Sequence, residues 1–534
     1  MQRISWLRTH VIALVLSVLF SLFTVSGIAS RLQLYNRASV LSLVVFLAVY
    51  GVLFYFLLDG LLHRPRARTS ESRLPGFPLV FGLLLLFWLP TYLAFYPGIF
   101  GYDGPVQIFY LVTDTLSAHH PVFHTWLLGG CFWLGKLLGG YAVGLAIYAA
   151  LQGIFVAFAA AYTLQWLKKR NIPTFLWWFS AFFFAANPVI PLLNMNTTKD
   201  VPFSALFVLV FLQLIDLLEQ GVALDRSGAG KIARFLLSAL VMCLMRNQGY
   251  YILFAIAVVT VLVLRRQRLR VAVLLLAAAI LGWFCMGPLN TLLGIPKGDA
   301  REMLSVPMQQ LACVWNKDRQ GSLTLSEEDR QAIENLIPPE YLVQYDPTDA
   351  DLVKSGFQTE VLKSDLPGYL SLYLRLGLRY PAAYWQAFSD LVSGFWDPAQ
   401  PGQYRSLMIS KTFEGVLGEE FDIQPDSHLE GYKTYLTLYV TNFSDLPLLN
   451  LLFSNALPAW VLLALLLAVI LHRRAQLACA VLFCAAQWAI CLLSPAVLVR
   501  YCMPLMLCMP VFAALLWETV TRRDRSPAPR LETT

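Results

Sequence analysis

Two polar segments interrupt the apolar N-terminal part of the chain, and the first holds an acid that could act as a catalytic base. In "YPGIFGYDGPVQ" (96–107), Pro105 favours the first turn of a helix, which places Asp103 at the helix cap and Gln107 one turn on. A carboxylate held just above a membrane can accept a proton from an acceptor hydroxyl. Asp103 is therefore the candidate catalytic base and Gln107 a candidate substrate contact; the alternative is an ordinary helix-capping aspartate.

The second segment, "SAHHPVFHTW" (117–126), contains three histidines. His120 and His124 are four residues apart and would share one helical face. Together with His119 they could hold a divalent metal, although no carboxylate is obviously placed with them, or they could hydrogen-bond a substrate. Histidines and aromatic residues at a membrane surface also pack among lipid headgroups with no other role.

Cations flank three later apolar runs. Lys199 lies in "NMNTTKDVP" (194–202), Arg246 in "LMRNQGYY" (244–251) and Arg500 in "SPAVLVRYCMP" (494–504). A guanidinium group matches phosphate oxygens with two parallel hydrogen bonds, and a lysine can grip the same group. A helix-capping Lys-Asp pair, snorkelling or simple ion pairing are the alternatives. The candidate substrate contacts here are Lys199, Asp200, Arg246, Gln248, Arg500 and Tyr501.

The composition indicates which kind of protein positions these residues. The chain has 534 residues, 57% hydrophobic and 14% charged, with a mean hydropathy of +0.60. Soluble domains carry about 25% charged residues, whereas apolar runs of about 20 residues cross a bilayer as helices. We expect an all-α polytopic membrane protein with about 12 transmembrane helices (range 11–13) and no disulfide framework among its nine cysteines. The expected spans are 10–30, 39–62, 75–96, 140–166, 174–191, 201–219, 234–247, 249–264, 271–291, 449–471, 476–493 and 502–520.

Basic clusters set the expected orientation, because cytoplasmic loops are enriched in Lys and Arg. The clusters lie in 63–73, 168–170, 225–234, 265–270, 472–474 and the tail from Arg522. All of them fall on one side if the stretch from Asp103 to Leu138 does not cross but lies along the outer face. The chain is then a multi-pass protein of the cell (plasma) membrane with both termini in the cytoplasm.

A long insert differs in charge from the rest of the chain. Residues Leu292 to Pro447 hold 22 of the 33 acidic but only 12 of the 40 basic residues, a net charge of −10 that leaves +17 elsewhere. Such a length suits one mainly helical outer domain, and the pattern does not suggest nucleic-acid binding. At its start, Glu302 and either Gln309 or Gln310 are candidates to face the membrane, and an ordinary amphipathic helix is the alternative. The predicted organisation is N-terminal transmembrane helices (1–96), a first long outer loop with interfacial helices (97–139), transmembrane helices (140–291), the outer acidic domain (292–447), C-terminal transmembrane helices (448–520) and a cytoplasmic tail (521–534).

An acid beside outward-facing cations describes a site for a lipid-linked phosphate. Displacing a sugar from such a phosphate needs a base for the acceptor and positive charge to stabilise the departing phosphate. Asp103 could supply the first, and Lys199, Arg246 and Arg500 the second. The sequence has no Gly-rich nucleotide-binding signature, which fits a lipid donor.

Several segments carry a resemblance to a known group of proteins. "YPGIFGYDGPVQ", "HHPVFHTWLLG", "NMNTTKDVPFSALF", "SVPMQQLA", "LRYP" and "SPAVLVRYCMPL" resemble blocks of a family of largely uncharacterised bacterial polytopic proteins that is similar to the GT-C superfamily of membrane glycosyltransferases. The resemblance runs from about Phe95 to Pro510. It implies a GT-C-like fold, a polyprenyl-phosphate-sugar donor and an aspartate base on the first outer loop, which is Asp103 here.

The chain also departs from the better-known members of that superfamily. It lacks a clear acidic pair in the first loop, and its outer domain lies between the ninth and tenth expected spans instead of at the C-terminus. The expected function is transfer of a sugar from a polyprenyl-phosphate-linked donor to an acceptor at the outer face. The partners would be that donor, membrane lipids and a cell-envelope glycan, lipid or protein acceptor. The alternatives are a transporter, flippase or polymerase-like protein for lipid-linked saccharides, or a scaffold whose acidic outer domain binds a partner.

Overall fold

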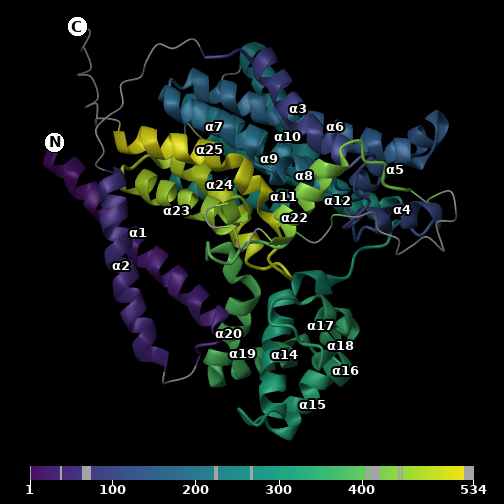
Figure 1. Ribbon diagram of the computed structural model, residues 1–534. Helices are drawn as coiled ribbons and strands as arrows, with labels where there is room; N and C mark the ends of the chain where they lie inside the picture. The colour runs from purple at the N-terminus through teal and green to yellow at the C-terminus, as the bar shows by residue number, and fades with distance from the viewer. Residues whose placement is uncertain are drawn as a thin grey trace.

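The computed structural model shows an all-helical chain (Figure 1), with no β-strand among the residues it describes. Those residues are 2–35, 39–62, 74–221, 226–264, 269–404, 407, 421, 423–442, 446 and 449–521. The basic segment 63–73, most of 265–270 and the tail from 522, which helped to set the expected orientation, lie outside them. All nine cysteines are described and none forms a disulfide.

Eight helical stretches among the described residues are long and apolar enough to cross a membrane, so the chain is a polytopic helical membrane protein. They are α1 (Gln2–Arg31), α2 (Val40–Leu62), α3 (Phe77–Ala94), α6 (Tyr141–Lys169), α9 (Asp200–Gln220), α10 (Arg226–Met245), α12 (Leu269–Met286) with α13 (Pro288–Leu292), and α25 (Val499–Thr521).

The four remaining expected spans correspond to shorter apolar helices. These are α7 (Thr174–Ala186), α11 (Gln248–Val263), α23 (Ala456–Leu471) and α24 (Ala475–Cys491). Helix α7 ends where Asn187 and Pro188 interrupt the apolar run, and the short α8 (Val189–Asn194) follows. An α-helix rises about 1.5 Å per residue, so helices of this length fall short of a hydrocarbon core of about 30 Å. Their role as spans stays a prediction.

One end of the bundle is tied together by an ion-pair network. The Arg170 guanidinium contacts Glu219 at 2.7 Å and Glu518 at 2.9 Å, and Arg474 contacts Glu518 at 3.0 Å. These contacts join the ends of α6, α9 and α25 to the start of α24. The basic clusters 168–170 and 472–474 therefore lie at the same end of the bundle, as the orientation argument requires.

Helices α4 (Gly104–Val112) and α5 (Val122–Leu138) lie together toward one end of the bundle (Figure 1). The His124 ring, near the start of α5, contacts the Tyr148 hydroxyl of α6 at 2.7 Å. Helix α6 begins only two turns before Tyr148 and ends at Arg170 in the ion-pair network. Both ends of α5 therefore lie near the start of α6, at the end of α6 that is far from this network. This is the geometry expected of a helix that stays on one side of the bundle and does not cross it.

The insert forms a second group of helices, which Figure 1 shows projecting from the bundle. Its own hydrophobic core is built from residues between Met308 and Ala387. Later residues of the insert, such as Phe395 and Tyr439, pack into the core of the membrane helices instead. The helices of this group are α14 (Ser305–Arg319), α15 (Glu327–Leu336), α16 (Pro339–Leu342), α17 (Asp351–Ser355), α18 (Thr359–Ser364), α19 (Leu366–Arg379) and α20 (Pro381–Val392).

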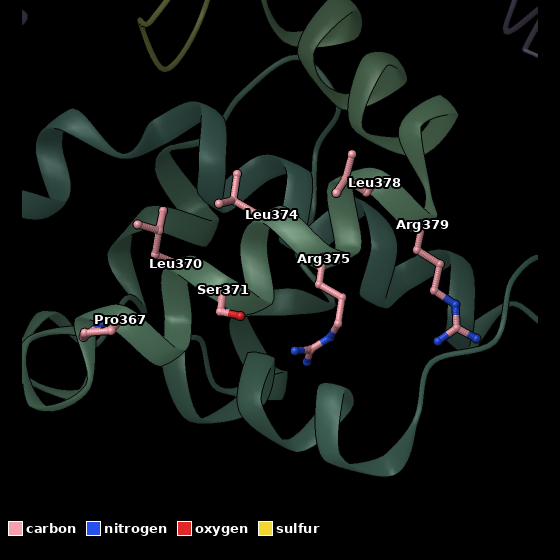
Figure 2. Close-up of a pocket in the computed structure, with 7 residues that line it drawn as sticks. All are labelled: Pro367, Leu370, Ser371, Leu374, Arg375, Leu378 and Arg379. Carbon is pink, nitrogen blue, oxygen red and sulfur yellow. The ribbon is translucent and has the colours of Figure 1, made fainter.

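Polar contacts fix the insert to the first membrane helix. Ser30 Oγ donates to Asp390 of α20 at 2.6 Å, and the Arg31 guanidinium pairs with Asp397. A shallow depression runs along the outer face of α19, where Leu370, Leu374 and Leu378 point outward beside two arginines (Figure 2). None of the residues that line this depression belongs to the predicted site.

Candidate functional site

Two loops far apart in the sequence pair with each other and bring the candidate base to the candidate lysine. The Ile99 amide donates to the Met195 carbonyl at 2.7 Å, and the Thr197 amide donates to the Ile99 carbonyl at 3.2 Å. The Thr197 hydroxyl also donates to the Gly101 carbonyl at 2.9 Å. This pairing aligns the start of α4 with the start of α9, where Asp103 and Lys199 stand.

The loops approach each other so closely that Gly104 admits no side chain. A Cβ built on Gly104 would lie 2.1 Å from the Thr197 hydroxyl oxygen. The glycine after Asp103 in the sequence is thus a packing requirement of the loop pair. It allows the first turn of α4 to rest directly on the segment that carries Lys199.

Five charged side chains from four regions of the chain form an alternating series. Lys199 Nζ lies 2.5 Å from Asp103 Oδ2, and Arg500 Nη1 lies 3.4 Å from the same oxygen. Arg500 Nη1 also lies 2.6 Å from Asp200 Oδ2, and the Arg246 guanidinium pairs with Asp200 Oδ1. We call Lys199, Asp103, Arg500, Asp200 and Arg246 the ion-pair cluster. It carries three positive and two negative charges.

Helix capping does not account for these acids. Asp103 occupies the cap position of α4, but its side chain makes no capping hydrogen bond and pairs with Lys199 instead. Asp200 is the first residue of α9 and points its oxygens at Arg246 and Arg500, with a further hydrogen bond from Thr198 Oγ1 at 3.1 Å. Both carboxylates are therefore committed to long-range contacts between helices.

Aromatic rings orient the two arginines. The Arg500 guanidinium carbon lies 4.7 Å from the ring centres of both Tyr102 and Tyr501, and Arg246 lies 5.6 Å from the Tyr501 ring. Tyr102 has a left-handed backbone (φ 51°). Stacking on an aromatic face holds a guanidinium group in one plane and leaves its edge for hydrogen bonding. The predicted substrate contact Tyr501 thus stacks on Arg500, and its contact with a substrate stays a prediction. Tyr102 was missed by sequence reasoning.

Accessibility divides the cluster into an inner and an outer part. The side chain of Asp200 is 1% exposed, whereas those of Asp103 and Lys199 are each 15% exposed and that of Arg246 is 20% exposed. Arg500 Nε is buried and has no hydrogen-bond partner among the described residues. A buried donor without a partner is costly, so this atom is suited to an acceptor from outside the chain. Asp200 is the internal anchor, and Arg500, whose side chain is 10% exposed, lies between it and the edge formed by Asp103, Lys199 and Arg246.

The protonation states follow from the contacts. Burial alone raises the pKa of Asp103, but the Lys199 and Arg500 cations outweigh it and hold the pKa well below its usual range. Burial and the Lys199 cation lower the pKa of His120 to about 2, so its ring is neutral and its Nδ1 accepts a hydrogen bond from Lys199 Nζ at 3.0 Å. In this state Asp103 is a weak base, because its carboxylate is already engaged by cations.

A polar network lies beneath the cluster and supports it. His124 Nδ1 contacts Gln107 Oε1 at 3.1 Å, and His124 Nε2 contacts the Tyr148 hydroxyl, which donates to Gln152 at 2.9 Å. Gln152 Nε2 in turn donates to the carbonyls of Asn194 and Asn196 at 2.9 Å. Gln107 and His124 are fully buried, so they support the loops and do not meet a substrate in this arrangement. Tyr148 and Gln152 were missed, although polar residues one turn apart inside an apolar helix are a readable signal.

The remaining predicted contacts lie outside the ion-pair cluster. The His119 ring is on the exposed surface beside His120, with ring centres 4.5 Å apart. Gln248 Nε2 donates to Gln487 Oε1 at 2.8 Å, and Gln487 Nε2 donates to the Tyr501 carbonyl at 3.4 Å. Gln309 and Gln310 donate to carbonyls within the insert, and Glu302 pairs with Lys354 at 2.9 Å. The hydrogen bonds and the ion pair of these three side chains are therefore made within the insert.

The histidines do not fit a metal site. Both ring nitrogens of His124 are engaged by side chains, and His120 Nδ1 is engaged by Lys199. The described residues contain no group of three or more His, Cys, Asp or Glu side chains placed to hold a metal ion. No step of the chemistry below is therefore assigned to a metal.

Comparison with known proteins identifies one relationship. The family of unknown function DUF6020 matches residues 108–529. Lys199, Arg246 and Arg500 lie within the matched region, and Asp103 lies just before it. No curated protein and no solved structure matches the chain.

Proposed function

The chain belongs to the DUF6020 family of unknown function, and we propose that it is a membrane glycosyltransferase of the GT-C-like kind. Its donor would be a sugar linked to a polyprenyl phosphate, and its acceptor would be a cell-envelope glycan, lipid or protein at the outer face. The observation that supports this most strongly is the ion-pair cluster itself. Three cations and two acids from four separate regions gather at one end of the membrane helices, where a lipid headgroup would lie.

The cluster suits a phosphate because its outer cations are reachable and one buried donor is unsatisfied. A lipid phosphate entering beside Lys199, Arg246 and Arg500 would accept hydrogen bonds from all three, including Arg500 Nε. The charges of the resting cluster sum to +1, so a negatively charged headgroup is attracted to it. The lipid chain would remain between or beside the membrane helices.

Donor binding would also activate the base. In the resting cluster Lys199 and Arg500 neutralise Asp103, which makes its carboxylate a weak base. When these cations turn to the phosphate, Asp103 loses their stabilisation and gains a negatively charged neighbour, so its pKa rises. The base becomes effective when the donor is in place.

The reaction that follows is a displacement at the anomeric carbon. The acceptor hydroxyl attacks that carbon, and Asp103 accepts the hydroxyl proton. The bond between the anomeric carbon and the phosphate oxygen breaks, and its electron pair leaves with the polyprenyl phosphate. Lys199, Arg246 and Arg500 stabilise the charge that develops on the departing oxygen.

Exchange of Asp103 for Asn tests this proposal against the alternatives. Purified protein in lipid nanodiscs is supplied with a panel of radiolabelled polyprenyl-phosphate hexoses and pentoses and with cell-envelope extract as acceptor. The wild type should transfer label, and Asp103→Asn should lower the rate of transfer by a factor of about 100 or more, the usual contribution of a general base. The control is Asp114→Asn, an exposed acid on the same loop, which should leave the rate unchanged.

A transporter or flippase would give a different result. It would move labelled lipid between leaflets of proteoliposomes without forming a new glycosidic bond, whatever residue stands at 103. A scaffold would show neither transfer nor lipid movement. Either outcome, obtained with folded wild-type protein, would contradict the transferase proposal.

A further inference from the structure

A second polar site lies at the opposite end of the same helices. A cavity of about 360 Å³ opens between the ends of α6 and α9 and the first turns of α10. Helix α9 has 21 residues, so at about 1.5 Å per residue this cavity lies about 30 Å from the ion-pair cluster. That distance matches the thickness of the hydrocarbon core, which places the cavity at the other membrane surface.

The cavity is rich in positive charge, of which the described residues neutralise only a part. Lys169, Arg170, Lys231 and Arg234 line it, against the single carboxylate of Asp216. Asp216 accepts a hydrogen bond from the Trp166 indole at 3.0 Å.

Two of the four cations have no side-chain partner among the described residues. Arg170 pairs with Glu219 and Glu518, and Lys231 donates to the neutral amide oxygen of Gln220. Within the part of the chain that the structure describes, the side chains of Lys169 and Arg234 make no hydrogen bond or ion pair. The cavity therefore offers free cationic donors to an anion.

An exposed apolar surface continues from the cavity toward the middle of the membrane. Phe158 lies one turn deeper on α6 than Tyr162, which lines the cavity, and the two rings stack with centres 6.3 Å apart. On α10, Leu237 lies one turn deeper than Arg234. Phe158 is 40% exposed and Leu237 is 64% exposed. A ligand that fills both regions has a phosphate at one end and an acyl chain at the other.

We infer that this cavity binds the phosphate headgroup of an anionic membrane lipid. Basic pockets between membrane helices suit such headgroups, and each Lys or Arg near the surface contributes about 1 kcal/mol, or about fivefold in affinity. The headgroup would contact Lys169 and Arg234, and the acyl chains would lie along Phe158 and Leu237. This inference does not depend on the proposed transfer reaction, because none of these residues belongs to the ion-pair cluster.

Native mass spectrometry of the full chain in detergent tests the inference. The protein is titrated with phosphatidylglycerol and, separately, with phosphatidylcholine of the same acyl chains. The wild type should bind phosphatidylglycerol more tightly, and Lys169→Gln/Arg234→Gln should lower that affinity by about 25-fold. The matched control, Lys297→Gln/Arg379→Gln, removes the same charge from exposed positions elsewhere and should bind as the wild type does.

Several outcomes would overturn the inference. Equal affinity for the two lipids would do so, and so would an unchanged preference in the double variant. Displacement of phosphatidylglycerol by millimolar glycerol phosphate would assign the cavity to soluble phosphate compounds instead. Should the double variant fail to fold, the single variants Lys169→Gln and Arg234→Gln each remove one exposed charge and should each lower affinity about fivefold.

Discussion

Lys199 Nζ lies 2.5 Å from Asp103 Oδ2, although the two residues are 96 positions apart in the sequence. The contact joins the loop after α3 to the loop before α9. It makes the candidate base and a candidate phosphate ligand partners in the resting protein. Binding of a phosphate at Lys199 is therefore coupled to the base strength of Asp103, and the first prediction follows from this coupling.

Exchange of Lys199 for Gln should weaken binding of a polyprenyl phosphate, because a charge-assisted hydrogen bond to phosphate contributes about 1.5–3 kcal/mol, or about 10- to 150-fold in affinity. Lys199→Arg should retain much of the affinity, since it keeps the charge. Fluorescence-based binding to protein in nanodiscs measures both. Lys297→Gln, which changes an exposed lysine of the insert, is the control. Equal affinities for the wild type and Lys199→Gln would show that Lys199 does not bind the phosphate.

Asp200 should matter for stability more than Asp103 does. Its side chain is 1% exposed and faces two arginines, and removing one partner of a buried ion pair costs about 3–5 kcal/mol. Asp200→Asn should lower the thermal unfolding temperature well below that of Asp103→Asn, whose side chain is 15% exposed. A thiol-reactive dye can follow unfolding, because eight of the nine cysteines are buried. A larger effect at Asp103 would contradict the division into an inner anchor and an outer edge.

His120 should make the protein less stable at mildly acidic pH. Its pKa is lowered from 6.5 to about 2 by burial and by Lys199, so below pH 6.5 the unfolded chain binds a proton that the folded chain does not. Stability then falls as the pH drops from 6.5 toward 2, with a limiting slope of about 1.4 kcal/mol per pH unit. His120→Asn should reduce the dependence of the free energy of unfolding on pH, measured between pH 7 and pH 5.

His119→Asn is the control for that titration. His119 lies nearer the surface than His120 and has no hydrogen bond to Lys199. Burial lowers its pKa as well, but by less than that of His120, so its replacement should change the slope less. Asp103 acts in a different window. Its lowered pKa contributes stability that is present above about pH 4, the usual carboxyl value, and is lost only below it. Burial lowers the pKa of His124 to about 3, so this ring adds a pH dependence of its own that remains in His120→Asn. A slope between pH 7 and pH 5 that is the same in His120→Asn as in the wild type would contradict the assignment.

Gly104 should tolerate no side chain. A Cβ there would lie 2.1 Å from the Thr197 hydroxyl oxygen, and overpacking of this kind costs about 1–3 kcal/mol. Gly104→Ala should lower both the unfolding temperature and lipid-phosphate affinity, because it forces apart the loops that hold Asp103 and Lys199. Gly130→Ala in α5 meets no atom within 4 Å and should leave both measurements unchanged or slightly improved.

The helices were largely predictable from the length of the apolar runs. The expected spans 75–96 and 201–219 correspond to α3 (Phe77–Ala94) and α9 (Asp200–Gln220). In the insert, Ser326 caps α15 by accepting from the Asp329 amide at 3.1 Å, and a Ser followed by acidic residues is a local signal for such a cap. Both features rest on local rules, because run length and capping depend on residues that are close in the sequence.

The composition of the ion-pair cluster was predicted, but its connections were not. Lys199, Arg246 and Arg500 are singled out by the sequence because they flank apolar runs and could bind a phosphate. That Asp103 pairs with Lys199, and Asp200 with both arginines, depends on the pairing of loops 99–101 and 195–197, for which one sequence offers no signal. Gln107 and His124 were expected to contact substrate, but the same pairing buries them in a supporting network.

The most direct measurement is a structure of the protein in nanodiscs with a polyprenyl phosphate bound. The account predicts that the phosphate lies within hydrogen-bond distance of Lys199 Nζ and Arg500 Nε, and that Asp103 has separated from Lys199. A phosphate bound elsewhere, with the contact between Lys199 and Asp103 unchanged, would contradict it.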